Sequence, residues 1–173
     1  MIDPKFTYDP IKDNFYWERA TIEDAEAISQ LAYNHYKGEI DVIFTPSAKS
    51  VKWNVSRDII EQSFDSTKTY ICVAKSKVDN HILAYCWFCR EYMIWSPDEC
   101  VSAKMMHIEL TESYRQRVRI IHQMIDQLHL WAQLCGVKIL LSTTVRNNQD
   151  GFLRLHANRG FTVRGSFCFK RIE

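Results

Sequence analysis

The segment NNQDGFLRLHANRGF, residues 147–161, carries the pattern that decides the fold of this chain. Its central part, residues 151–159, predicts a short helix. Gly160 is typical of the position that ends a helix, because glycine adopts the left-handed backbone conformation without strain. The stretches around this helix predict strands, namely VKILLSTT (137–144), FTVRG (161–165) and SFCFKRI (166–172). The C-terminal part therefore predicts a short helix set between strands, the first of them buried.

A long amphipathic helix is predicted immediately upstream of residue 137. Ser113 with Gln116 forms a capping-box pattern at its start, and Gly136 follows its end. Apolar side chains recur along it at helical spacing, which indicates one buried face. They are Ile121, Met124, Ile125, Leu128, Ala132 and Cys135. A helix between two strands makes a right-handed crossover, so the strands that it joins are predicted to be parallel.

The N-terminal half predicts the rest of the sheet. Thr21 with Asp24 predicts a capped helix that reaches Tyr36, and Ser47 opens a second helix that reaches Phe64. Four stretches rich in β-branched and aromatic residues predict strands. They are FYWERA (15–20), TYICVAKS (69–76), HILAYCWFC (81–89) and VSAKMMHIEL (101–110). The fold class predicted is α/β, with a mixed, mostly antiparallel sheet of six to seven strands flanked by helices.

The chain is predicted to form one domain with a short arm. Residues 1–14 contain Pro4 and Pro10 without any periodicity and predict an irregular N-terminal arm, while residues 15–173 predict a single domain. Residues 91–100, EYMIWSPDEC, predict a loop that carries apolar side chains of the exposed type. Such loops often contact protein partners.

The composition excludes several classes of protein. Of the 173 residues, 46% are hydrophobic and 25% charged, and 22 Lys and Arg residues against 21 Asp and Glu give a net charge of +1. A balance so close to neutral predicts neither nucleic-acid binding nor attraction to a membrane surface. No apolar run approaches the length of a membrane span, and MIDPKFTYDP lacks the features of a secretion signal. We therefore expect a cytoplasmic protein with reduced cysteines.

No metal site is predicted. Cys86 and Cys89 form a CxxC pair, but no second pair follows, and the stretch reads as a strand in which the two side chains face opposite sides. His122 and His129 share a helix face without an acidic or cysteine partner nearby in the sequence. Packing is the favoured interpretation for all four side chains.

The order of these elements over residues 16–172 resembles the GNAT superfamily of N-acetyltransferases. Those proteins often have an asparagine after the fifth strand, a small residue three positions later, then Leu-Tyr and Gly-Phe pairs. The matching residues here are Asn148, Gly151, Leu155, Gly160 and Phe161. The opening RATIEDAEAISQL (19–31) is similar to the first strand and helix of that superfamily. The resemblance implies a GNAT-like domain and, for an active member, acetyl-CoA as the cofactor.

The resemblance also implies where acetyl-CoA would bind. In GNAT proteins the cofactor lies where two central strands separate, and its pyrophosphate rests on the N-terminus of the helix after the fourth strand. Free N–H groups and the helix dipole favour an anion there, and glycines let the phosphate oxygens approach the backbone closely. The corresponding residues here are Leu110, Arg115, Gln116, Arg117, Val118 and Arg119, with Asn148 after the fifth strand.

The glycines of that motif are missing. Val118 and Ile120 stand where the family pattern has its small residues, and β-branched side chains place methyl groups where phosphate oxygens would lie. A cap between Ser113 and the N–H of Gln116 would also use one of the donors. The segment therefore predicts a weakened pyrophosphate site.

Three arginines in the same segment allow two interpretations. Arg115, Arg117 and Arg119 could hold phosphates by their guanidinium groups instead of the backbone. However, residues two apart on a helix are rotated by roughly 200°, so the three do not share a face. The other interpretation is a solvated basic helix start, with one arginine paired to Glu112 or Asp126.

The catalytic groups implied by the resemblance are also altered. His156 occupies the position of the family's acid tyrosine; a histidine can protonate a thiolate because its pKa lies near neutrality, and it equally suits a protein that needs no acid. Strand alternation places His107 and Glu109 on one face. Glu109 resembles the family's glutamate base if that face lines the cleft, and otherwise both are surface or core-edge residues.

Three functions remain open. The first is a GNAT-fold structural or interaction module without acyl-CoA chemistry, binding a protein partner through residues 91–100 or the arm. Phage-encoded GNAT-like proteins, including internal virion components, look similar in their altered cofactor loops, which implies a virion location if a phage encodes this chain. The second is an acetyl-CoA-dependent N-acetyltransferase with an arginine-based phosphate grip. The third is a regulator that binds a CoA-like ligand without turnover.

Overall fold

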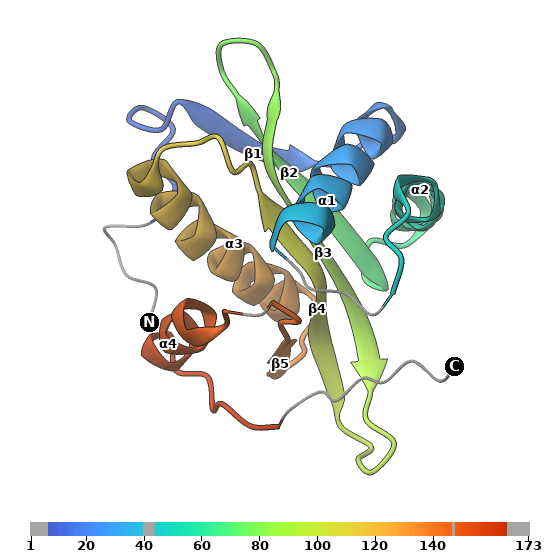
Figure 1. The fold of residues 1–173 in the computed structure, drawn as a ribbon. Coiled ribbons are helices and arrows are strands. Elements are labelled where there is room, and N and C mark those ends of the chain that lie inside the picture. Colours follow the sequence, from blue (N-terminus) through green and yellow to red (C-terminus); the bar gives the residue numbers. More distant parts are fainter. Residues whose placement is uncertain (1–6, 40–43, 147, 166–173) are drawn as a thin grey trace.

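The computed structural model describes residues 7–39, 44–146 and 148–165 (Figure 1). Within them, five strands form one sheet in the order β1-β2-β3-β4-β5, antiparallel except for the parallel pair β4–β5. The strands are β1 (Phe15–Arg19), β2 (Thr69–Ser76), β3 (Ile82–Tyr92), β4 (Glu99–Ile108) and β5 (Ile139–Ser142). The helices are the 3-10 turn η1 (Ile22–Asp24), α1 (Ala25–Glu39), α2 (Ala48–Phe64), α3 (Tyr114–Leu134) and α4 (Asp150–Asn158).

Helices cover both faces of the sheet. Because strand side chains alternate, successive residues of β2 and β3 enter different cores. Cys72, Ala74 and Cys86 pack with Met124 and Leu128 of α3. On the other face, Ile71, Val73 and Tyr85 pack with Ile28 of α1 and with Val55 and Ile59 of α2. The α4 helix lies beside α3 (Figure 1), and its C-terminal Arg159 pairs with Asp126 of α3.

The predicted fold class is confirmed, but the predicted strand count is too high for the described residues. FTVRG (161–165) is not a strand, because residues 162–165 are exposed and Gly165 has a φ of +83°, which is incompatible with an extended ladder. SFCFKRI (166–172) lies outside the described residues. The β5 strand is shorter than predicted and only partly buried, with Ile139 exposed.

The predicted loop at residues 91–100 is largely the tip of a hairpin. The β3 strand continues to Tyr92 and β4 begins at Glu99, with these two residues paired across the ladder. Arg90 donates two hydrogen bonds of 2.6 Å to the Glu99 carboxylate, which favours the longer hairpin. Residues 93–98 connect the strands, and Figure 1 shows this tip extending beyond the helices.

Candidate functional site

The parallel pair of strands, β4 and β5, separates part-way along the sheet. The β4 and β5 strands are paired from Cys100 to Ala103, opposite Ile139 to Ser142, and β4 then continues to Ile108 paired only with β3. The N–H of Glu109 donates to the Leu83 carbonyl at 2.7 Å. Alternation of the antiparallel ladder therefore turns the backbone of Ile108 away from β3. The candidate site consists of this separation and the adjacent N-terminus of α3.

A histidine of α1 hydrogen bonds to a backbone carbonyl of β4 at this separation. His35 is fully buried, and its Nε2 hydrogen bonds to the Ile108 carbonyl. Its ring stacks on that of His107, with centroids 4.6 Å apart and planes 12° apart. The carbonyl can only accept, so His35 carries its proton on Nε2 when the ring is neutral.

His107 is held in this buried cluster by aromatic neighbours. The Tyr85 hydroxyl lies 2.9 Å from His107 Nδ1, and the edge of the Tyr36 ring faces the imidazole with centroids 5.7 Å apart. Burial lowers the pKa of His107 well below its usual value, and electrostatic interactions with His35 and Arg146 lower it further. His107 is therefore neutral at physiological pH.

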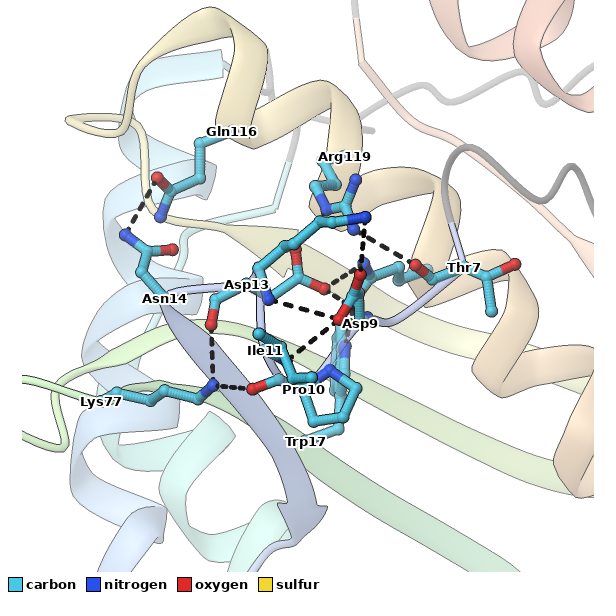
Figure 2. Close-up of polar contacts among 12 residues, drawn as sticks. Thr7, Asp9, Pro10, Ile11, Asp13, Asn14, Trp17, Lys77, Gln116 and Arg119 are labelled. Carbon is cyan, nitrogen blue, oxygen red and sulfur yellow. Dashed lines mark hydrogen bonds and ion pairs between the residues drawn. The ribbon is translucent and has the colours of Figure 1, made fainter.

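The first turn of α3 uses its own backbone donors. Ser113 Oγ accepts a hydrogen bond from the N–H of Gln116 at 3.3 Å, and the Ser113 carbonyl accepts one from the N–H of Arg117 at 2.9 Å. The predicted cap is therefore confirmed. The side chain of Gln116 turns instead to the N-terminal arm, where its Oε1 accepts from Asn14 Nδ2 at 3.4 Å (Figure 2).

The N-terminal arm binds one of the three arginines. The buried Asp13 carboxylate forms an ion pair with Arg119 and accepts a hydrogen bond from Gln123 Nε2 at 3.2 Å. Arg119 also donates to the Thr7 carbonyl at 3.3 Å (Figure 2). The sequence suggested Glu112 or Asp126 as the ion-pair partner of an arginine here, but Arg119 pairs with Asp13, and Asp126 pairs with Arg159.

The other two arginines point elsewhere. Arg115 is exposed to solvent, and Arg117 lies about 200° around the helix from Arg119. Arg117 is half-buried, and its Nε has no hydrogen-bond partner among the described residues. Ile120 is fully buried in the core beneath α3, while Val118 is partly exposed.

His156 connects α4 to the end of β5. Its Nδ1 bonds the Phe152 carbonyl at 2.9 Å, and its Nε2 lies 3.0 Å from Ser142 Oγ. Because the carbonyl can only accept, the neutral ring donates from Nδ1 and accepts the Ser142 hydroxyl proton at Nε2. Its ring is buried against Phe152 and Phe161, and burial lowers its pKa. Both nitrogens therefore serve internal contacts.

The remaining predicted site residues lie apart from this cluster. Glu109 follows the end of β4, where its carboxylate accepts from the Thr111 N–H at 3.3 Å and lies 4.0 Å from His81 Nε2. Leu110 is partly buried in the turn before α3, and Asn148 is exposed before α4. Neither Glu109 nor His156 contacts the His35–His107 pair through any of these bonds.

Comparisons with known proteins identify the fold. No protein-family model and no curated protein sequence matches this chain. A predicted acetyltransferase with acetyl-CoA from Clostridium acetobutylicum superposes with a TM-score of 0.68 at 12% identity, covering 91% of this chain and 96% of that one. The aminoglycoside N-acetyltransferase AAC(6')-Iy in complex with CoA gives 0.67 at 12%, covering 95% and 99%. Glucosamine-6-phosphate N-acetyltransferase from Arabidopsis thaliana gives 0.64 at 12%, covering 93% and 100%.

This chain has the GNAT fold. The separation of β4 and β5 lies where the GNAT resemblance implies an acyl-CoA cleft, and the start of α3 lies where it implies the pyrophosphate site. No helix in the described part of the chain has the length and hydropathy needed to cross a membrane. Across the same residues, no cluster of three or more His, Cys, Asp or Glu side chains could hold a metal ion.

Four residues of this GNAT-like site were missed from the sequence. Each of them bonds one group of the site. The pairs are His35 with the Ile108 carbonyl, Asp13 with Arg119, Tyr85 with His107, and Ser142 with His156. His35 could have been noticed, because it falls on the buried face of α1 together with Ile28 and Leu31. The others carry no local signal.

The lowered pKa values of His107 and His156 predict that acid destabilises this protein. Their pKa values are lowered by folding, so below the ordinary histidine pKa of about 6.5 the unfolded chain binds more protons than the folded one. We expect the free energy of unfolding to fall between pH 7 and 5, by up to about 1.4 kcal/mol per pH unit for each histidine. Urea denaturation at several pH values measures this. His107→Gln and His156→Gln should each flatten the profile, and a flat wild-type profile would contradict the prediction.

Proposed function

We propose that this protein is a GNAT-fold interaction module that does not carry out acyl transfer. The observation that carries the proposal is that the groups expected to grip acyl-CoA are bonded inside the protein. The N–H of Gln116 is in the helix cap, Arg119 is in the ion pair with Asp13, and both nitrogens of His156 are bonded. The backbone start of α3 therefore does not fit a pyrophosphate.

The separation of β4 and β5 supports the same conclusion. His35 already bonds the Ile108 carbonyl, which is a backbone group that a ligand between the two strands would meet. Displacing this bond would cost a buried hydrogen bond, roughly 1–3 kcal/mol. A ligand at the separation of β4 and β5 would have to offset that cost before gaining affinity.

The tip of the β3–β4 hairpin is the surface that we assign to a protein partner. Ile94 is fully exposed, and Trp95 and Tyr92 are 81% and 64% exposed. Large apolar side chains gathered at one exposed tip mark interaction sites, and Trp and Tyr are the side chains that most often dominate binding energy. The N-terminal arm is the weaker choice, because Asp13 is buried and Lys77 donates to the carbonyls of Pro10 and Asp13 (Figure 2).

We expect such a module to act in the cytoplasm, or in a virion if a phage encodes it.

The assignment of the hairpin tip is tested on any protein found to bind this chain. Its affinity is measured for the wild type and for an Ile94→Ser, Trp95→Ser variant. Loss of a hot-spot tryptophan typically costs about 2 kcal/mol or more, which weakens affinity roughly thirtyfold. If the wild type and the variant bound every such partner with equal affinity, the hairpin tip would not be the partner site.

Two observations favour a second function, an acetyl-CoA-dependent N-acetyltransferase. The β4–β5 separation is present, and Arg117 on the start of α3 has an Nε without a partner among the described residues. That guanidinium could hold a phosphate by its side chain. Under this alternative Arg117, and not Arg115 or Arg119, is the residue that replaces the glycine-rich backbone grip.

Calorimetric titration with acetyl-CoA tests these two functions against each other. We expect no saturable binding below about 1 mM, a limit that corresponds to roughly −4 kcal/mol. Binding in the low-micromolar range would overturn the main proposal. In that case Arg117→Ala should weaken binding while the matched control Arg115→Ala leaves it unchanged. Release of free thiol that depends on an added amine would then show catalysis, and its absence would leave a ligand-binding regulator.

The Val118→Gly variant tests whether the missing glycines at the start of α3 prevent acetyl-CoA binding. Val118 is partly exposed at the start of α3, so its removal opens the backbone without touching the core. Ile120→Gly is unsuitable, because this side chain is fully buried and its loss would leave a cavity that costs several kcal/mol. If Val118→Gly alone produced micromolar acetyl-CoA binding, the β-branched side chain would be the obstacle.

A further inference from the structure

The α2 helix has two apolar faces, and only one of them is covered. Its inner face packs Val55 and Ile59 under the sheet. Its outer face exposes Trp53, Ile60 and Phe64, whose exposed fractions are 72%, 53% and 88%. A surface helix normally presents polar side chains to water on its outer side. The outer face of α2 therefore has the composition of an interface.

The three exposed side chains form one continuous stripe. An α-helix turns about 100° per residue, which places Trp53, Ile60 and Phe64 within about 40° of one another, on the side opposite Val55. From Trp53 to Phe64 the stripe is about 16 Å long at a rise of 1.5 Å per residue. Trp53, Ile60 and Phe64 together form the α2 stripe.

Apart from the buried Asp58, the charged residues of α2 run from basic to acidic along the helix. Lys49, Lys52 and Arg57 come first, and Glu61 and the C-cap residue Asp65 follow. This order opposes the helix dipole, which favours acidic groups at the start of a helix and basic groups at its end. The first turn of α2 contains no acidic residue and the last turn no basic one. The charge order therefore does not stabilise an isolated helix.

Two copies of α2 with this charge order are complementary when they run antiparallel, because the basic part of each then faces the acidic part of the other. We propose that the α2 stripe packs against the α2 stripe of a second copy of this chain, with the two helices antiparallel about a twofold axis. Trp53 then lies against the partner's Phe64, and Arg57 lies beside the partner's Glu61. A parallel arrangement would oppose like charges and like dipole ends. A twofold contact of this kind is closed, because the same patch is used on both copies.

The size of the stripe sets the strength of the dimer. One helix pair buries less than the roughly 1,200–2,000 Å² of a standard stable interface. The dimer is therefore weak, with a dissociation constant in the micromolar range. This inference does not depend on whether the protein binds acetyl-CoA or uses its hairpin tip.

Sedimentation equilibrium of the full chain tests the dimer. Between about 5 and 200 µM, a range chosen to span micromolar dissociation constants, the wild-type mass should rise from the monomer value of 20.4 kDa towards twice that value. The variant Trp53→Glu, Phe64→Glu should stay monomeric throughout. The matched control Ile94→Glu, Trp95→Glu changes two equally exposed apolar residues at the hairpin tip and should still dimerise.

Three outcomes would overturn the proposal. They are a wild-type mass that stays monomeric at the highest concentration, a dimer that survives the α2 substitutions, and growth beyond a dimer. Circular dichroism checks that the variants are folded, and both substituted pairs are on the surface. A folded α2 variant that has lost the dimer while the hairpin variant keeps it supports the assignment.

Cross-linking tests the antiparallel register. In a chain that also carries Cys135→Ser and Cys168→Ser, Trp53→Cys and Phe64→Cys variants are prepared separately and treated with a short bismaleimide. The antiparallel arrangement predicts cross-linked dimers in a mixture of the two and few in either variant alone. Efficient cross-linking of each variant alone would show a parallel arrangement and overturn the register.

Discussion

Replacing Asp58 by alanine is expected to lower the free energy of unfolding by about 2–4 kcal/mol, because the substitution leaves buried donors without an acceptor, while the ion-pair partners Arg57 and Lys104 are themselves 57% and 38% exposed. The Asp58 carboxylate is buried beneath α2 and accepts hydrogen bonds from Trp87 Nε1 at 2.8 Å and Lys104 Nζ at 3.1 Å. Arg57 and Thr69 donate to it as well, at 2.7 and 3.3 Å. Its loss therefore leaves donors from α2, β2, β3 and β4 without their common acceptor.

Urea denaturation measures this effect, and Asp65→Ala provides the control. Asp65 is an aspartate at the end of the same helix, and within the described part of the chain its carboxylate accepts hydrogen bonds from the N–H and hydroxyl of Thr67 alone. We expect its substitution to cost about 1 kcal/mol or less, as for a single exposed cap. Equal effects of the two substitutions would show that the Asp58 cluster does not hold α2 on the sheet.

The pH dependence of the Asp58 effect has a definite sign. Burial by itself would raise the pKa of Asp58, but the hydrogen bonds from Arg57 and Lys104 lower it below the ordinary value. A carboxyl whose pKa is lowered by folding stabilises the protein above its unfolded pKa of about 3.9, and this stabilisation is lost as the pH falls through the folded value. The difference between wild type and Asp58→Ala should therefore shrink below about pH 4.

Replacing Asp13 by alanine is expected to cost about 2–3 kcal/mol. This is less than for a fully buried pair because the Arg119 side chain is 29% exposed. Asp13 joins the arm to α3 through Arg119 and Gln123, and its carboxylate also accepts from the N–H of Asp9 at 2.8 Å (Figure 2). Without it the arm loses its buried ion pair with α3 and keeps the longer contacts of Thr7 and Asn14, so limited proteolysis should cleave residues 7–14 several-fold faster.

A double-mutant cycle separates the ion pair from the rest of the arm. If the pair carries the effect, Arg119→Ala should cost less in an Asp13→Ala background than in wild type, by about 1 kcal/mol or more. Arg115→Ala is the matched control, because this arginine is exposed on the same turn of α3 and should change stability by less than about 0.5 kcal/mol. Additive effects of Asp13→Ala and Arg119→Ala would contradict the importance of their contact.

Much of the architecture was predictable because it depends on local periodicity. The apolar spacing of Met124, Ile125 and Leu128 predicted the buried face of α3, and the Ser113 cap fixed where that helix begins. The final strands were predicted less well. FTVRG has a strand-like composition, but a short edge strand is decided by its neighbour in space, and composition does not reveal whether that neighbour exists.

The candidate site was predictable in position but not in its contacts. The absence of glycine between Arg115 and Ile120 was visible in the sequence, and it correctly directed attention to the start of α3. The sequence did not show that Asp13 would bind Arg119, since the two are 106 residues apart. It equally gave no sign that His35 would bond the Ile108 carbonyl, 73 residues away.

The sequence by itself determined the α/β class, the order of the central elements and the lack of a glycine-rich phosphate loop. These follow from side-chain period, capping residues and residue type, all of which act over a few positions along the chain. Only the tertiary structure decided which groups of the candidate site are already bonded and which apolar face of α2 is uncovered. Those properties depend on which distant segments the sheet brings together, because hydrogen bonding and burial are decided by neighbours in space.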